Sequence, residues 1–157
     1  MCKIIVMANQ KGGVAKTSST RNLAYSLAEL GKKVLAVDFD PQTNLTISFG
    51  VAPAALQETA ASLMMKLVMD EALPEKESCI LNIGKVDLLP SKKTLTVAEV
   101  NLLIERKDDC LAKLLAPLRA DYDYILVDTG PSLGSLTINA FTAADEIIIP
   151  VDPELFA

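Results

Sequence analysis

The segment at residues 9–18, with the sequence NQKGGVAKTS, most strongly constrains the fold, because it stands between an apolar run (4–7) and a helix-like one (17–30). Its two adjacent glycines let the backbone curl so that successive N–H groups point toward an anion. Lys16 adds positive charge for phosphate oxygens, and Thr17 offers a hydroxyl to Mg²⁺. The N-terminus of the following helix adds its positive dipole end. The segment predicts a phosphate-binding loop; the alternative is an ordinary strand-to-helix turn.

Length and composition exclude several classes of protein. The chain has 157 residues, half of them apolar, which suits a single domain with a substantial core. It contains no histidine, which excludes histidine-dependent nucleophilic catalysis and histidine-ligated metals. A net charge of −5 gives no overall attraction to nucleic acid. Cys2, Cys79 and Cys110 lack metal-ligand spacing and are interpreted as apolar filler in a reducing cytoplasm. No apolar run approaches the roughly 20 residues of a membrane span.

Strand and helix patterns alternate along the chain, which indicates an α/β fold with a mostly parallel sheet flanked by helices. Residues 1–157 are expected to form one nucleotide-binding domain. Ligands of such sheets bind beyond the carboxyl ends of the strands. The predicted strands are 3–7, 34–37, 79–83, 85–89, 124–127 and 147–151, and the predicted helices are 17–30, 53–69, 97–104, 110–118 and 133–144.

Acidic side chains follow two further apolar strands. Asp128 ends the strand at 124–127, an arrangement that delivers a carboxylate to the coordination shell of Mg²⁺. Asp38 and Asp40 flank Phe39, and the period of two along a strand puts both carboxylates on one side. One of them could face a nucleotide and place the attacking water. The alternatives are a strand-end Asp that caps a turn and a simple Asp-Pro turn.

Together these segments resemble the ParA/Soj type of partition ATPase. The pattern K-G-G-x-x-K-T resembles the deviant Walker A motif of the ParA/MinD superfamily. Residues 37–44 (VDFDPQTN), 122–134 (YDYILVDTGPSLG) and 143–151 (AADEIIIPV) resemble the segments that follow it in that family. The resemblance implies a deviant Walker A P-loop fold that binds ATP and Mg²⁺.

The resemblance also implies a role for each matching residue. Residues 12–18 (Gly12, Gly13, Val14, Ala15, Lys16, Thr17 and Ser18) would wrap the phosphates. Thr17 and Asp128 would hold the metal, and Asp40 would orient the hydrolytic water. Lys16 would contact the β and γ oxygens, and Lys11 would reach the partner's nucleotide in an ATP-dependent homodimer. In this family a centromere-binding, ParB-like partner stimulates slow hydrolysis, and the dimer binds DNA nonspecifically.

The chain departs from the family pattern at three places. Ala15 replaces a usual glycine, and its methyl group would cost roughly 1–2 kcal/mol if the position needs positive φ. Gly130 stands where the family usually has proline. The sequence also ends at Ala157, so we expect the N-terminal portion of such a fold, with little DNA binding and self-association through uncovered apolar faces.

Two other functions stay open at this point. One is a nucleotide-binding or assembly module without turnover. The other is a MinD-like positioning ATPase, which requires an amphipathic C-terminal helix that these residues do not show.

Overall fold

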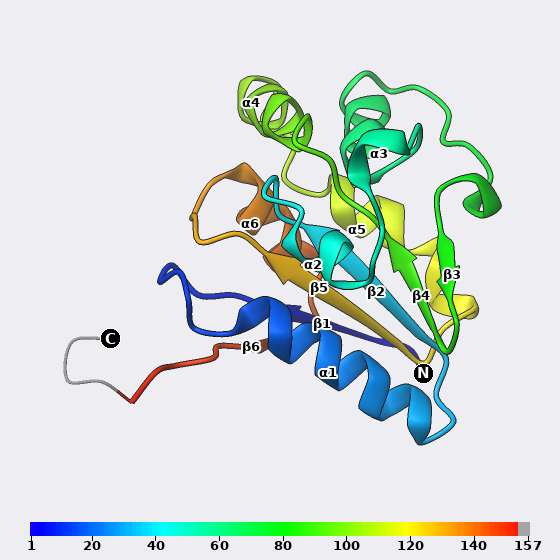
Figure 1. Ribbon diagram of the computed structural model, residues 1–157. Helices are drawn as coiled ribbons and strands as arrows, with labels where there is room; N and C mark the ends of the chain where they lie inside the picture. The colour runs from blue at the N-terminus through cyan, green and yellow to red at the C-terminus, as the bar shows by residue number, and fades with distance from the viewer. Residues whose placement is uncertain (154–157) are drawn as a thin grey trace.

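The computed structural model describes residues 1–153, and six strands within them form one sheet in the order β3-β4-β2-β5-β1-β6. Only the β3–β4 pair is antiparallel; every other neighbouring pair is parallel. The predicted α/β fold is confirmed (Figure 1). The strands are β1 (Lys3–Met7), β2 (Val34–Phe39), β3 (Leu81–Ile83), β4 (Val86–Leu89), β5 (Tyr124–Thr129) and β6 (Glu146–Ile148).

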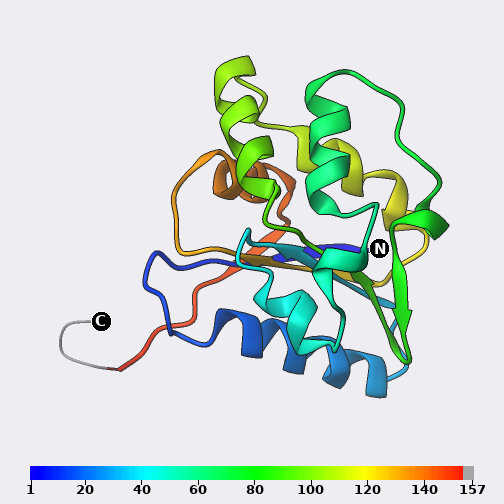
Figure 2. The same cartoon turned by 45° about the horizontal axis from the view of Figure 1, so that its top comes forward.

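Helices cover both faces of this sheet. Figure 2 shows the sheet nearly edge-on, with α1 and α2 on one side and the other four α-helices on the opposite side. The α-helices are α1 (Lys16–Glu29), α2 (Asn44–Ser48), α3 (Ala60–Val68), α4 (Leu95–Glu105), α5 (Cys110–Leu115) and α6 (Ser135–Ala143). Three short 3-10 helices, η1 (Pro53–Ala55), η2 (Lys76–Ser78) and η3 (Pro117–Ala120), lie in the connections.

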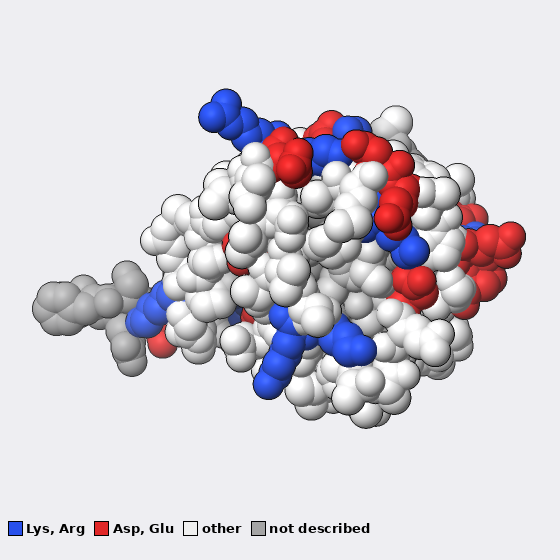
Figure 3. All heavy atoms as spheres, turned by 90° about the horizontal axis from the view of Figure 1, so that it is seen from above, with Lys and Arg blue, Asp and Glu red and all other residues white. Residues whose placement is uncertain are grey.

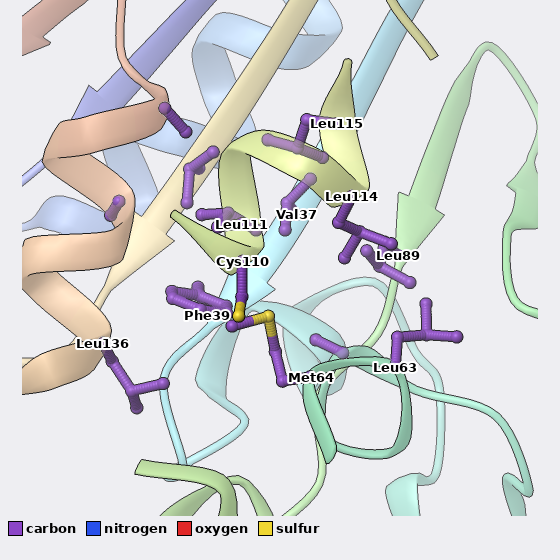
Figure 4. Packing of buried hydrophobic residues seen from close by; sticks show 14 of the residues in the cluster. Val37, Phe39, Leu63, Met64, Leu89, Cys110, Leu111, Leu114, Leu115 and Leu136 are labelled. Atoms are coloured by element: carbon purple, nitrogen blue, oxygen red, sulfur yellow. The ribbon is translucent and has the colours of Figure 1, made fainter. Parts of the chain in front are cut away.

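The alternation of side chains along β1 divides the core into two clusters. Ile4 and Val6 belong to the larger cluster under α3–α6, whereas Ile5 belongs to the cluster under α1 and α2. The larger cluster includes Cys110 and Met64, whose side chains point toward each other in the view of Figure 4. All three cysteines are buried and unpaired, and burial raises the pKa of each thiol. This agrees with their interpretation as apolar filler.

The helix predicted over residues 53–69 is wrong as a single element. The chain forms η1, then an extended stretch, and α3 begins only at Ala60. Thr59 has extended backbone with φ of −151°, and its N–H donates to the Ser62 hydroxyl at 2.8 Å. This local hydrogen bond caps α3 and separates it from η1.

Other boundaries also differ from the sequence prediction. The helix predicted at 110–118 is split, because Pro117 lacks the N–H that would continue α5 and begins η3 instead. The last strand covers Glu146–Ile148 instead of 147–151. The short helix α2 was not predicted at all.

The described surface combines mixed charge with some exposed apolar side chains. Over the face that carries α3–α6, basic and acidic side chains are interspersed near the rim (Figure 3). The exposed apolar side chains include Ile147 and Ile148 of β6, Ile149 just after it, and Ile138 and Phe141 of α6. The predicted self-association through such faces stays a prediction. Within residues 1–153, no helix is long and apolar enough to cross a membrane.

Candidate functional site

The loop between β1 and α1 curls tightly around the N-terminus of the helix. Gly13 and Ala15 have left-handed backbone, with φ of 80° and 63°. The Lys16 ammonium folds back across the loop and donates hydrogen bonds to the carbonyl oxygens of Asn9 (2.9 Å) and Lys11 (3.1 Å). Lys16 is 8% exposed, so its charge is held within the loop. Position 15 does require positive φ, and the alanine methyl there is strained.

Asn9 organises the start of this loop, a role that the sequence analysis did not assign. Its side-chain carbonyl accepts the Lys11 N–H at 2.9 Å, and its amide donates to the Pro150 carbonyl at 2.7 Å. The loop is therefore tied to the segment that follows β6. The only signal in the sequence was the position of Asn9 two residues after a buried strand.

Asp128 is the last residue but one of β5 and lies beside the first turn of α1. Its carboxylate accepts a hydrogen bond of 2.6 Å from the Thr17 hydroxyl and a longer one of 3.5 Å from Thr20. The side chain is fully buried. Burial raises the pKa of Asp128 to about 7; the Thr17 hydrogen bond opposes the rise, and the nearby carboxylates of Asp38 and Asp40 add to it.

Asp38 and Asp40 have different surroundings, although only one residue separates them. Asp38 is fully buried and accepts hydrogen bonds from the Thr46 N–H (2.8 Å), the Thr46 hydroxyl (2.6 Å) and the Asp40 N–H (3.2 Å). Burial raises its pKa to about 6. Asp40 accepts the Gln42 N–H at 2.9 Å and lines an open cleft. Asp38 thus anchors α2, and Asp40 is the carboxylate that faces the cleft.

This cleft of about 450 Å³ lies where β1, β2 and β5 end. Of the nucleotide residues predicted from the sequence, it brings together Gly12, Gly13, Ala15, Lys16, Thr17 and Ser18, with Asp40 opposite them. Three predicted site residues are not in its lining: Val14 and Asp128, which are buried, and Lys11, which lies at the start of the loop. Four further residues line the cleft without a site role predicted from the sequence: Gln42, Asn44, Thr129 and Pro131.

The donors at this cleft fit magnesium better than a transition metal. Thr17 and Asp128 offer only oxygen atoms, which Mg²⁺ prefers. Within the described residues, no group of three or more acidic, cysteine or histidine side chains could hold a metal ion. Mg²⁺ suits such a site, because it retains waters and takes most of its remaining oxygens from a phosphate ligand.

Comparisons with known proteins agree with this geometry. Residues 2–157 match the AAA domain family, and the chain belongs to it. The sporulation initiation inhibitor protein Soj of Bacillus subtilis is 39% identical over 158 residues, which cover all of this chain and 61% of Soj. The resemblance to ParA/Soj-type partition ATPases is thereby confirmed.

Solved structures share the fold at similar identity. A cobyrinic acid a,c-diamide synthase from Mycobacterium smegmatis with bound ATP analog and magnesium has a TM-score of 0.89 and 35% identity, covering all of this chain and 63% of that one. A plasmid partition protein from Borrelia burgdorferi has a TM-score of 0.84 and 33% identity, covering all of this chain and 69% of that one. The chain spans about half to three fifths of the length of the curated relatives it matches.

Proposed function

We propose that this chain binds Mg-ATP at residues 12–18 and hydrolyses it slowly as part of a partition ATPase. The single observation that carries this proposal is the meeting of the Lys16 loop, Thr17 and Asp40 around one cleft, with the buried Asp128 hydrogen-bonded to Thr17. Phosphoryl transfer depends mainly on position and charge neutralisation, and these residues supply both. The partition role is supported by the relatives that carry that name.

Each side chain has a distinct part in this proposal. The N–H groups of residues 12–18 bind phosphate oxygens, and Lys16 exchanges its two carbonyl partners for the β and γ phosphates. Mg²⁺, when bound, neutralises phosphate charge; the Thr17 hydroxyl would ligate it, and Asp128 would hold its water shell. Asp40 accepts a hydrogen bond from the attacking water and orients it toward the phosphate.

The proposal extends to assembly and partners. Lys11 acts in trans in an ATP-dependent homodimer, so the protein cycles between monomer and dimer. A ParB-like centromere-binding protein stimulates hydrolysis, which is slow alone because no arginine is among the described residues that line the cleft. The net charge of −5 predicts weak DNA binding by these residues alone.

Two alternatives remain to be separated from this function. A module that binds ATP without turnover would keep the Lys16 contacts but release no phosphate. The second alternative is a different reaction on the same fold. The diamide synthase shares the fold under a different activity name, so overall similarity does not choose the reaction.

Phosphate release at saturating Mg-ATP tests the proposal, measured for the parent chain and Asp40→Ala. We expect slow release by the parent and at least a tenfold loss in the variant, with ATP affinity within twofold. Asp38→Asn is an unsuitable control, because Asp38 anchors α2. If the parent releases phosphate and Asp40→Ala matches its rate, Asp40 is not the water-orienting residue. If the parent releases none, the binding-module alternative is favoured.

A further inference from the structure

The loop after β5 passes very close to the Asp40 side chain. A Cβ atom built on Gly130 would lie 3.0 Å from Oδ1 of Asp40, 3.3 Å from Cγ and 3.6 Å from Oδ2. The two nearer contacts are tighter than nine in ten real Cβ contacts. The carboxylate of Asp40 therefore packs directly on the backbone of residue 130, in space that any other side chain would enter.

The remaining contacts of Asp40 restrict its alternatives. Its Oδ1 accepts the Gln42 N–H at 2.9 Å. Its backbone carbonyl accepts the Thr43 N–H and the Ser91 hydroxyl, both at 3.0 Å. Asp40 is only 6% exposed. These hydrogen bonds hold the backbone of Asp40, and one of its carboxylate oxygens is bonded to the Gln42 N–H. The contact with residue 130 therefore sets how far the carboxylate can lie from the cleft.

We propose that Gly130 is a positioning residue that sets the place of the Asp40 carboxylate at the cleft. The consequence for catalysis rests on the proposed function, in which Asp40 orients water. In this chain, which has glycine where the family usually has proline, a Cβ added at position 130 would press on the carboxylate and shift it by a few tenths of an ångström. Because water-orienting groups are sensitive to displacements on this scale, the shift lowers turnover while leaving phosphate binding intact.

The contact itself can be tested in the nucleotide-free protein, by thermal unfolding of Gly130→Ala with and without Asp40→Ala. Gly130 does not have positive φ, so alanine fits the backbone there without strain. By itself this substitution stabilises the protein, because alanine lowers the conformational entropy of the unfolded chain. We expect Gly130→Ala to lower the Tm by about 2–6 °C in the parent, because of overpacking against the carboxylate. In the Asp40→Ala background the same substitution should raise the Tm slightly. Equal changes in both backgrounds would overturn the proposal.

Gly134→Ala is the matched control at the other end of the same loop. A Cβ there would meet the Glu99 carboxylate at 2.0 Å and is not near Asp40. Its effect on the Tm should be the same in the parent and in Asp40→Ala. A coupling to Asp40 as large as that of Gly130 would mean that the whole loop shifts, which contradicts a local positioning contact.

Steady-state kinetics test the functional consequence. Gly130→Ala should lower kcat about three- to tenfold with KM for Mg-ATP within twofold, whereas Gly134→Ala should change neither by more than twofold. An unchanged kcat in Gly130→Ala overturns the catalytic role even if the unfolding cycle shows the contact. If the parent itself does not turn over, the proposed function fails and the catalytic role falls with it, while the unfolding cycle still decides whether Gly130 places the carboxylate.

Discussion

The two ends of the sheet hold acidic side chains in opposite electrostatic conditions. At the amino ends of the strands, Arg119 forms a two-pronged pair with Asp145 at 2.9 and 3.0 Å, and this contact lowers the pKa of Asp145. At the carboxyl ends, burial raises the pKa of Asp128 to about 7 and that of Asp38 to about 6. Lys16 is the basic residue in the lining of the adjacent cleft, and its ammonium donates hydrogen bonds to backbone carbonyl oxygens.

This difference separates a stabilising arrangement from a functional one. Paired surface charges contribute modestly to stability and need no further ligand. Buried carboxylates with raised pKa values are stabilised in their charged form by an added cation. The lysine and the curled loop beside them are stabilised by an added anion, so a ligand that carries both suits this end of the sheet. Mg-ATP supplies both. The amino end also has a larger hollow of about 550 Å³. Its lysines and acids are exposed except for the half-buried Asp87, and two of them, Lys76 and Asp121, pair at 2.6 Å.

Lys16→Ala should give the largest effect of any single change. The variant loses charge-assisted hydrogen bonds worth roughly 1.5–3 kcal/mol each, so the affinity for Mg-ATP should fall at least tenfold. Lys76→Ala, at the other end of the sheet, is the control and should bind as the parent does. Titration calorimetry measures both. Equal affinity in Lys16→Ala would place the nucleotide elsewhere.

Asp128→Asn should stabilise the nucleotide-free protein above pH 7. Asp128 has a folded pKa of about 7 against an ordinary value of 3.8, so the folded state binds its proton more tightly. The free energy of unfolding should therefore fall as the pH rises from about 4 to 7, and Asn should recover about 1–3 kcal/mol at pH 8. Denaturant unfolding at pH 5 and pH 8 checks this. A variant with the parent's pH dependence would show that Asp128 is not the titrating group.

Ala15→Gly should stabilise the protein by about 1 kcal/mol, because φ of 63° strains a residue with a Cβ. Thr43 has a similar φ of 60° at the start of α2, so Thr43→Gly is the matched comparison. Thermal unfolding should show a rise of a few degrees in each case. A loss of stability at position 15 would mean that the methyl group makes contacts that outweigh the strain.

Arg119→Ala should have the smallest effect and leave the cleft unchanged. The variant loses the Asp145 pair and a hydrogen bond of 3.0 Å to the Cys2 carbonyl. Both partners of the pair are about one third exposed, so the cost should be below about 1 kcal/mol. The pKa of Asp145 lies below its ordinary value, so this contribution is present above about pH 4 and is lost as the pH falls through the folded pKa. A change in Mg-ATP affinity would show that the two ends are coupled.

The sequence predicted the parts of the fold that depend on local pattern. Strands β1, β2 and β5 are almost continuously apolar, as buried parallel strands are, and each leads to a polar motif. Their common edge then follows from parallel pairing, which is why the cleft near Lys16 and Asp128 was predictable.

Features that depend on tertiary contacts were not predictable. The five-residue helix α2 is too short to be stable alone and is held by Asp38 through Thr46. The different surroundings of Asp38 and Asp40 depend on which carboxylate α2 engages. The approach of Gly130 to Asp40 joins residues 90 positions apart, and no local pattern encodes it.

A structure of the chain with Mg²⁺ and a non-hydrolysable ATP analogue is the most direct test of nucleotide binding at this cleft. We expect the phosphates on the N–H groups of residues 12–18, Lys16 turned from the carbonyls of Asn9 and Lys11 onto them, and the metal beside Thr17 and Asp128. A nucleotide bound instead at the amino end of the sheet, or phosphates in the cleft with Lys16 still on its carbonyl partners, would contradict it.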